Sequence, residues 1–323
     1  MPSLLRTGVV GAGVFGSYHA AKLADCGLVA DSNIVFAGVY DTDAECAQAL
    51  AQKYNTKAYH SYHMFLEEMD AVVIAAPASD HFSLCEAALL KGCHCFVEKP
   101  LALTVSAVDR LIALADTKNL VLQIGHQERY VCASVGLFSR ERAPVRIECV
   151  RRVPHTGRCN DVSVTFDLMV HDLDIVRQLT GADLSTVYAS GNADEISAEL
   201  LLENGTVAVL EAARRSKVSE RRMTLVYDDG VIDFDFIERT ISNTTPAQLN
   251  GDISPDEAPL AIRDPLAYGA ALFIEAIRFS KTPVVSGHDG RVTVSWAQQI
   301  EQAAQIGVGR IGAEAEVDKR LRA

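Results

Sequence analysis

A lysine, Lys99, follows an apolar run, residues 93–97, that we interpret as a buried strand. Open parallel sheets bind ligands at the carboxyl ends of their strands, and Pro100 stops this strand and fixes the turn. We therefore expect Lys99 to contact a substrate. A second set of chemical groups lies further on: Asp167 and His171 are four residues apart, a spacing that places both on one face of a helix. We expect the two sets to form opposite walls of one cleft.

The helix that carries Asp167 and His171 has further polar residues on the same face, Asp174 and Arg177. Asp167 would lie near its N-terminal end, where the helix dipole favours a carboxylate. The alternative interpretation is an exposed polar face that holds a salt bridge.

The elements that must position Lys99 begin with a glycine motif. An apolar strand, residues 4–10, leads into Gly-x-Gly-x-x-Gly, and a helix follows over residues 14–26. This order is typical of a dinucleotide site: the first glycine permits a tight turn, the second admits the pyrophosphate, and the third lets helix and strand pack closely. The alternative is an ordinary tight strand–helix turn. The residues expected to contact the cofactor here are Gly11, Gly13, Val14, Phe15 and Gly16.

An acid follows the second apolar strand, residues 34–40. Asp41 lies 25 residues beyond Gly16, close to the spacing of about 20 expected for a ribose-binding acid. A carboxylate there binds the ribose hydroxyls and repels a 2′-phosphate, so Asp41 favours NAD over NADP. It could also cap the helix predicted over residues 44–53.

Strands and helices continue to alternate up to Lys99 and beyond it. Apolar runs indicate further strands, and the intervening segments have helical spacing. Six strands with intervening helices predict an α/β doubly wound parallel sheet. The remaining strands are expected at 57–60, 70–75, 93–97 and 120–124, with a helix at about 104–117.

Length and composition set limits on the whole protein. The chain has 323 residues and a net charge of −12, which indicate two domains and argue against nucleic-acid binding. No apolar run reaches the roughly 18 residues of a membrane span, and the early glycine motif leaves no room for a signal peptide. The eight cysteines are scattered, which fits a reducing cytoplasm, and Cys93-His94-Cys95 is interpreted as strand rather than metal site.

Three motifs stand in one order in the first half: Gly11-x-Gly13-x-x-Gly16, Pro77-x-x-x-His81 and Glu98-Lys99-Pro100. Together they resemble the Gfo/Idh/MocA family of NAD(P)-dependent oxidoreductases, in which Glu-Lys-Pro is the more specific element. The resemblance implies that Lys99 lies near the nicotinamide and the reacting carbinol. It also implies that Glu98, Lys99 and the loop from Pro77 to His81 help seat the cofactor. Alternatively, His81 is a solvated or capping side chain.

The helix motif Asp167-x-x-x-His171-x-x-Asp174 resembles the substrate-domain motif of the same family, although Ser-Val-Thr replaces the usual preceding glycine pair. The resemblance implies that Lys99, Asp167 and His171 are catalytic. His171 would be the general base, Lys99 would stabilise negative charge on the same oxygen, and Asp167 would orient His171 or bind a neighbouring hydroxyl. Gly125 to Tyr130 resembles the segment where the chain crosses into the second domain. A helix is expected to follow it through Phe138, and then a strand at 145–152.

The second half, after residue 181, reads as strands at 187–192, 195–202, 206–213, 223–227 and 231–236. Asn-Gly and Asp-Gly pairs predict hairpins, so we expect a large, mostly antiparallel open-faced sheet in an α+β domain. The expected domains are 1–125, which binds the cofactor, and 126–323, whose C-terminal helices at 266–279 and 290–307 could pack back on the first. A loop is expected at 242–259. In the family the open face joins subunits, which implies a homodimer or homotetramer.

The expected reaction is hydride transfer between NAD and a secondary alcohol of a sugar, polyol or sugar derivative. Arginines 151, 152 and 158 and His155 crowd one segment of an acidic chain, which indicates an anionic substrate group or, alternatively, solvated surface arginines. A dinucleotide-binding sensor without turnover and a reductase of a non-sugar carbonyl remain open. The candidate substrate-binding residues are Arg129, Arg152, Arg158 and Asp174.

Overall fold

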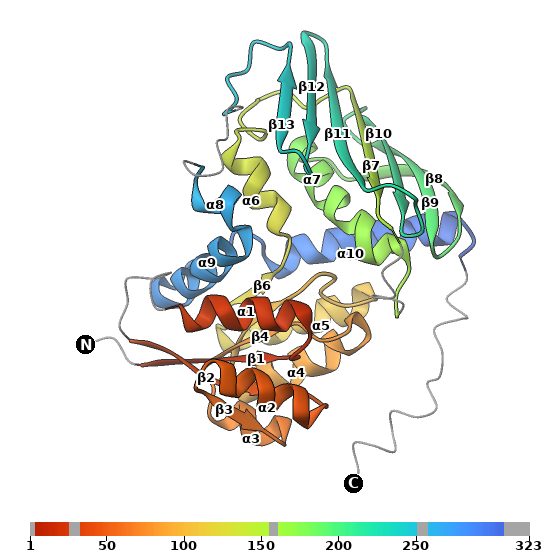
Figure 1. The fold of residues 1–323 in the computed structure, drawn as a ribbon. Helices are drawn as coiled ribbons and strands as arrows, with labels where there is room; N and C mark the ends of the chain where they lie inside the picture. The colour runs from red at the N-terminus through yellow and green to blue at the C-terminus, as the bar shows by residue number, and fades with distance from the viewer. Residues whose placement is uncertain (1–3, 26–32, 155–160, 251–257, 307–323) are drawn as a thin grey trace.

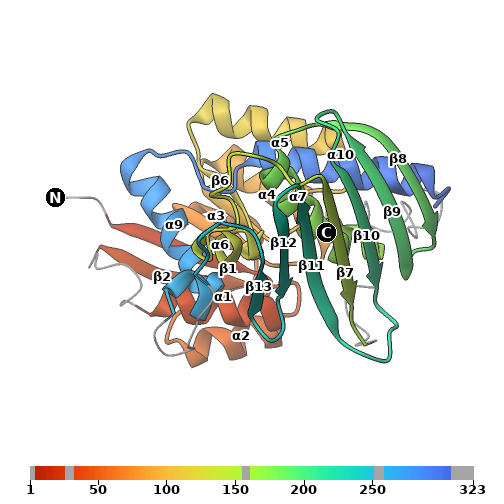
Figure 2. The ribbon, with the colours of Figure 1, turned by 90° about the horizontal axis from the view of Figure 1, so that it is seen from above.

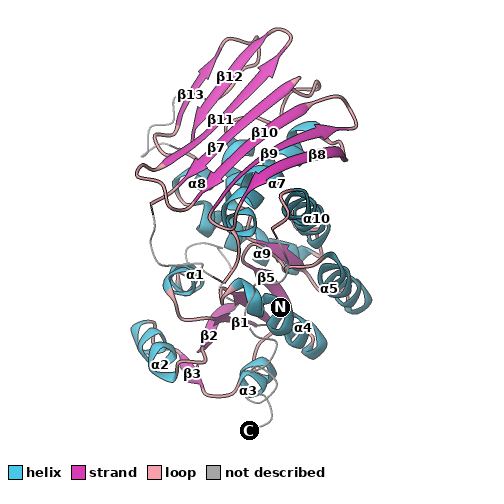
Figure 3. Cartoon of the chain, turned by 90° about the vertical axis from the view of Figure 1, so that its right-hand side faces the viewer, coloured by secondary structure: helices cyan, strands magenta, loops and turns pink. Residues whose placement is uncertain are grey.

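The computed structural model describes the chain except for residues 1–3, 26–32, 155–160, 251–257 and 307–323. Each half of the chain builds one sheet, and helices fill the layer between the two sheets (Figure 1). Seen from the side, the sheet of the second half stands above the helices and the sheet of the first half lies beneath them (Figure 3).

The first sheet is a doubly wound parallel sheet, as the sequence predicts. Its strand order is β3-β2-β1-β4-β5-β6, and every neighbouring pair is parallel. The order reverses between β1 and β4, so the crevice at their carboxyl ends is the expected ligand site. The strands are β1 (Leu5–Val10), β2 (Ile34–Tyr40), β3 (Lys57–Tyr59), β4 (Ala71–Ile74), β5 (His94–Val97) and β6 (Leu122–Ile124).

Local signals in the sequence define the helices around this sheet. Asp43, Ser61 and Thr104 accept hydrogen bonds from backbone amides at helix starts, and Gly92 and Asn119 end two helices in the left-handed conformation. The connecting helices are α1 (Val14–Ala24), α2 (Ala44–Lys53), α3 (Tyr62–Glu67), α4 (His81–Lys91) and α5 (Val105–Lys118). The starts expected for α1, α2 and α5 were residues 14, 44 and about 104, and each of these helices begins within one residue of its expected start.

The second sheet has seven strands in the order β13-β12-β11-β7-β10-β9-β8. All neighbouring pairs are antiparallel except β7 and β10, which run parallel. The strands are β7 (Arg146–Arg152), β8 (Leu184–Gly191), β9 (Glu195–Leu202), β10 (Val207–Ala213), β11 (Glu220–Tyr227), β12 (Gly230–Asp235) and β13 (Thr240–Asn243). This is the mostly antiparallel sheet that the sequence predicts.

One face of the second sheet packs on α7 (Val170–Thr180), and no described helix covers the other face (Figure 3). The alternating pattern shows which residues face inward: in β9, Ile196, Ala198, Leu200 and Leu202 are buried and their neighbours are exposed. α6 (Gln127–Ser134) lies beside α7 and leads from the first sheet into this half.

The C-terminal helices return to the first half. α9 (Pro265–Phe279) packs on α1, and α10 (Gly287–Ala303) contacts both α5 and α7 (Figure 2). Phe273 meets Phe96 of β5 with ring centroids 5.8 Å apart, and the amide of Ile124 donates to the carbonyl of Val285 at 3.0 Å. The last helices therefore complete the core of the cofactor half.

Several boundaries differ from the sequence-based expectations. α6 ends at Ser134, whereas the helix was expected to run through Phe138. The predicted loop over 242–259 overlaps the end of β13, and a short helix, α8 (Leu260–Arg263), precedes α9. Both missed elements are only four residues long, too short for a periodic pattern to identify. None of the helices described in the structure is long and apolar enough to cross a membrane.

Candidate active site

The glycine turn between β1 and α1 has the geometry of a dinucleotide site. Gly11 has φ +95°, and a Cβ atom there would lie 2.7 Å from the Ala75 carbonyl oxygen. A Cβ on Gly16 would lie 1.7 Å from the carbonyl oxygen of Gly11, whereas a Cβ on Gly13 would meet nothing within 4 Å. The first and third glycines are thus required by the fold itself. The open space beside Gly13, at the positive end of α1, fits a pyrophosphate.

Asp41 lies where the ribose-binding acid is expected, at the carboxyl end of β2. One of its carboxylate oxygens accepts a hydrogen bond from the Ala12 amide at 2.5 Å, and the other accepts from the Asp43 amide at 2.8 Å. The cap of α2 is Asp43, which accepts from the amides of Glu45 and Cys46. Asp41 therefore joins the glycine turn to the end of β2, and its carboxylate retains free lone pairs for ribose hydroxyls.

A cavity of about 300 Å³ opens beside this turn. Both halves of the chain form its walls: the loops after β1, β4 and β5 on one side, and residues just before α7 on the other. Asp161 also links the halves, because its carboxylate accepts a hydrogen bond from the Ser79 amide at 3.3 Å. The expected residues that line the cavity are Gly13, Val14, Phe15, Pro77, His81, Glu98, Lys99 and Asp167.

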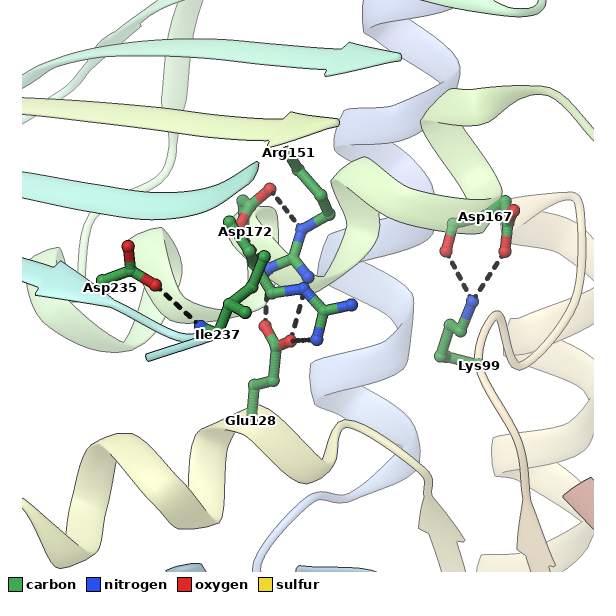
Figure 4. A network of polar contacts seen from close by, with 8 residues as sticks. Lys99, Glu128, Arg151, Asp167, Asp172, Asp235 and Ile237 are labelled. Carbon is green, nitrogen blue, oxygen red and sulfur yellow. Dashed lines mark hydrogen bonds and ion pairs between the residues drawn. The ribbon is translucent and has the colours of Figure 1, made fainter. Parts of the chain in front are cut away.

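Lys99 reaches from the end of β5 to the second half. Its ammonium donates to the backbone carbonyl of Asp167 at 2.5 Å and to the carboxylate of Asp167 at 3.0 Å (Figure 4). Only 16% of the lysine side chain and 13% of the aspartate side chain are exposed. The peptide bond from Lys99 to Pro100 is cis. The structure thus brings two of the three expected catalytic residues into direct contact.

Glu98, next to Lys99, is buried and held from both sides. His19 of α1 and Gln127 of α6 each contact the same carboxylate oxygen at 2.7 Å. Burial alone raises the pKa of Glu98, but the hydrogen bond and charge of His19 and the charge of Lys99 outweigh it, so the net pKa is lowered. The carboxylate is therefore ionised at neutral pH and fixes the strand end that carries Lys99.

His81 is buried rather than solvated. Its ring nitrogens lie 2.7 Å from the carbonyl oxygen of Pro100 and 2.9 Å from that of Ala76. Burial lowers the pKa of His81, while the two backbone acceptors oppose that shift because both favour a ring that carries two protons. His81 therefore ties the loop after β4 to the loop after β5 at the cavity wall.

The helix that carries His171 begins with a π-helical turn, Thr165–Met169, and continues as α7. Such turns are rare and are frequent at functional sites. Asp167 lies inside this turn and His171 is the second residue of α7. Burial lowers the pKa of His171 well below its usual value, and the charges of Lys99 and Arg151 lower it further. At neutral pH the imidazole is uncharged and carries a proton on only one ring nitrogen, so the other nitrogen is free to act as a general base.

Two of the expected substrate-binding residues bind each other instead of facing the cavity. The guanidinium of Arg129 forms a bidentate pair with Asp174, and it also contacts Asp289 at 3.0 Å. Arg129 is 4% exposed and Asp174 is 1% exposed. This buried pair joins α6, α7 and the start of α10, so its position is that of a structural clamp.

Arg152 lies on the open face of the second sheet, away from α7. Its guanidinium pairs there with Glu211 and with Glu220 at 2.9 Å. Arg158 lies outside the described residues. Arg152 is therefore not among the described residues that line the cavity, and the role expected of Arg158 stays a prediction.

Comparison with known proteins adds to this geometry. A family model for Gfo/Idh/MocA, described as an oxidoreductase family with an NAD-binding Rossmann fold, matches residues 5–126. UDP-N-acetylglucosamine 3-dehydrogenase from Acidithiobacillus ferrooxidans is 36% identical over 314 residues, which cover 93% of this chain and 97% of the relative. The chain belongs to the Gfo/Idh/MocA family.

Solved structures of other proteins share this fold. The structure of the Acidithiobacillus ferrooxidans enzyme aligns with a TM-score of 0.83 and 34% identity, covering 94% of this chain and 99% of that one. A levoglucosan dehydrogenase in complex with NADH and L-sorbose aligns with a TM-score of 0.82 and 18% identity, covering 94% and 97% of the two chains. This second likeness shows a shared fold.

This Gfo/Idh/MocA oxidoreductase also holds a buried network that the sequence did not reveal. Arg151 is 1% exposed and forms bidentate pairs with both Asp172 and Glu128, at 2.5–2.9 Å (Figure 4). Arg221, the cross-strand neighbour of Arg151, adds a contact to Glu128 at 3.0 Å. The network joins α6, β7, β11 and α7, and its member Asp172 is the residue that follows His171 in α7. Alternation along β7 was the available signal, because it places Arg151 and Arg152 on opposite faces.

Proposed function

We propose that this protein is an NAD-dependent dehydrogenase that oxidises a secondary hydroxyl of a sugar-like, nucleotide-linked substrate. The observation that carries the proposal is the contact between Lys99 and Asp167. It places the ammonium of the cofactor half against the helix that bears His171, at a cavity that opens onto Gly13.

The chain supplies acid–base chemistry and positioning. NAD, when bound, supplies the acceptor for the hydride. Neutral His171 takes the proton of the substrate hydroxyl, and Lys99 donates a hydrogen bond to the same oxygen as negative charge develops there. Asp167 holds Lys99 in place and keeps its charge close to the cavity. The glycine turn would bind the pyrophosphate of NAD, and Glu98 and His81 fix the two cavity loops that follow β5 and β4.

Two substitutions test these roles, each with a matched control on the surface. Lys99→Met and His171→Asn should each lower kcat by about a hundredfold or more. Lys281→Met and His63→Asn change the same residue types at exposed positions and should leave kcat within about twofold. A loss of less than about tenfold in both active-site variants would remove Lys99 and His171 from the mechanism.

The position of Asp41 supports NAD over NADP. A 2′-phosphate would place its charge beside this carboxylate, and Asp41 is already fixed by the Ala12 amide. Asp41→Ser should therefore weaken NAD binding and reduce the difference in affinity between NAD and NADP. Titration of intrinsic fluorescence with each cofactor measures this. Equal affinity of the parent protein for NAD and NADP would contradict the assignment.

The substrate class rests on the most similar relative described above, an enzyme named for UDP-N-acetylglucosamine. We therefore expect NADH formation with UDP-N-acetylglucosamine at a much higher kcat/KM than with N-acetylglucosamine or myo-inositol. Tight NAD binding without turnover of any of these compounds would favour a dinucleotide sensor. Turnover of the free sugar or of inositol alone would instead place the substrate among unlinked polyols.

The uncovered face of the second sheet supports a homo-oligomer, either a dimer or a tetramer. Its apolar residues include Tyr188, which is 67% exposed, Leu201, which is 40% exposed, and the half-buried Val209. Val209→Lys would add a charge to this face between Glu148 and Glu199 of the neighbouring strands, where the fold tolerates it. Light scattering should show a lower mass for this variant, and a monomeric parent would contradict the proposal.

We also propose that residues 1–125 act as the cofactor half and residues 126–323 as the substrate and assembly half. The six described cysteines are free thiols and five of them are buried, which supports a reducing, cytoplasmic location.

A further inference from the structure

His126 lies at the point where β6 passes into α6, and its imidazole is enclosed by protein. The side chain is 1% exposed, and neither ring nitrogen has a hydrogen-bond partner among the described residues. More than about nine in ten buried polar groups in proteins are paired, and each unpaired one costs about 1–3 kcal/mol. Two unpaired nitrogens in one buried ring therefore point to a small polar partner.

The ring that packs against His126 is that of His171. Their centroids are 6.0 Å apart and their planes meet at 88°. The Nδ1 atom of His171 is also buried without a partner. Three buried and unpaired imidazole nitrogens thus belong to two rings that pack against each other, and no direct hydrogen bond joins the two rings.

The acids near His171 are already committed to cations. Asp167 binds Lys99, Asp172 binds Arg151, and Asp174 binds Arg129. None of the three carboxylates accepts a hydrogen bond from the imidazole of His171. A general base nevertheless needs one ring nitrogen to carry the proton and the other to be free. Another group must therefore set the tautomer of His171.

We propose that His126 does this through one buried water, which accepts from Nδ1–H of His171 and donates to a ring nitrogen of His126. Two hydrogen bonds of about 2.8 Å each let one water join nitrogens up to about 5.6 Å apart, and the centroids of the two rings lie 6.0 Å apart. A buried water is stable with two to four polar partners, and Nδ1 of His171 together with one ring nitrogen of His126 supplies two. His126 is then a positioning residue that keeps Nε2 of His171 free to act as the base.

This role rests on the proposed dehydrogenase function and keeps its protons balanced. In oxidation the hydroxyl proton of the substrate goes to Nε2 of His171, and the carbinol hydrogen leaves with its two electrons as hydride to NAD. The imidazolium returns the Nε2 proton to solvent when the product leaves. The proton on Nδ1 and the proton of His126 stay in place throughout.

The tautomer can be measured directly in the full-length protein without substrate. Protein labelled with ¹⁵N-histidine should show, in two-bond proton–nitrogen spectra at neutral pH, that His171 carries its proton on Nδ1. His126→Phe keeps a ring of similar size but cannot bind the water, so the Nδ1–H preference of His171 should be lost. His63→Phe, a change at an exposed position, should leave the spectrum of His171 unchanged.

Kinetics separates positioning from a general structural effect. His126→Phe should lower kcat by about tenfold to a hundredfold with KM within about threefold, and His126→Gln, which can hold the water, should recover most of kcat. A parent protein with the Nε2–H tautomer would overturn the proposal, even if the variants fail to fold. So would an unchanged tautomer in His126→Phe. If the tautomer of His171 depends on His126 but the protein turns over no substrate, the result would count against the proposed function and not against the role of His126.

Discussion

Arg151 offers the sharpest test of how this active site is supported. Replacing it with Met keeps a similar apolar stem but removes a guanidinium that makes four hydrogen bonds, two to Asp172 and two to Glu128. Glu128 keeps its contact with Arg221, whereas Asp172, which is 3% exposed, is left without a cation. Breaking a buried ion pair in this way costs about 3–5 kcal/mol, and we expect Arg151→Met to lower the free energy of unfolding by that amount.

A matched surface variant provides the control. Arg222 forms a similar pair with Asp233, but 54% of its side chain is exposed, so Arg222→Met should cost less than about 1 kcal/mol. Urea denaturation followed by circular dichroism measures both. The double variant Arg151→Met/Asp172→Asn should be more stable than Arg151→Met by about 1–2 kcal/mol, because the uncompensated charge is gone. Equal costs for Arg151→Met and Arg222→Met would refute the reasoning.

Three further results are expected. Gly13→Ala should keep the unfolding midpoint of the parent but lose NAD binding, because its Cβ would meet nothing within 4 Å in the fold yet would occupy the space expected for the phosphates. Gly16→Ala should lower the unfolding midpoint itself, because its Cβ would lie 1.7 Å from the carbonyl oxygen of Gly11. Equal midpoints for the two variants would contradict this. Lys99→Met should raise the pKa of His171 in an NMR titration, because the charge of Lys99 is, after burial, the main cause that lowers this pKa. An unchanged pKa would show that the charge of Lys99 does not act on His171. The free energy of unfolding should fall as the pH drops below about 6.5, because the unfolded chain then binds more protons than the folded one. Four buried or partly buried histidines have lowered pKa values in the folded chain: His81, His94, His126 and His171. A urea midpoint that stays constant from about pH 7.5 to 5.5 would be the contrary result.

The fold of the first half could be predicted closely because its signals are local. Apolar strands buried on both faces, the glycine turn and helix caps such as Thr104 each depend on a few adjacent residues. The second sheet could be predicted as strands and hairpins, but the parallel pairing of β7 with β10 could not. That pairing is set by which apolar faces meet in three dimensions, and strand alternation carries no information on the partner.

In the candidate site, too, local signals were predictable from the sequence and tertiary packing was not. Lys99 and Asp167 were identified by type and spacing, and the structure places them in contact. Arg151 and Arg152 are adjacent in sequence and were considered as one basic cluster, yet one is buried behind α7 and the other lies on the open face. Alternation separates the two side chains, but only tertiary packing shows which face is the inner one. The shared environment of His126 and His171 likewise depends on how α6 and α7 pack.

The parallel pairing of β7 with β10 has a consequence for synthesis. β7 leaves the ribosome before both of its neighbours in the sheet, because the π turn, α7, β8 and β9 are all made before β10 and β11. Until then its backbone hydrogen bonds have only water as a partner, and Arg151 has no enclosed place to occupy. Long-range pairing of this kind is slow and leaves strand edges open to other chains. We expect nascent chains that end within residues 153–206 to be the ones that chaperones engage, with release once β11 has emerged.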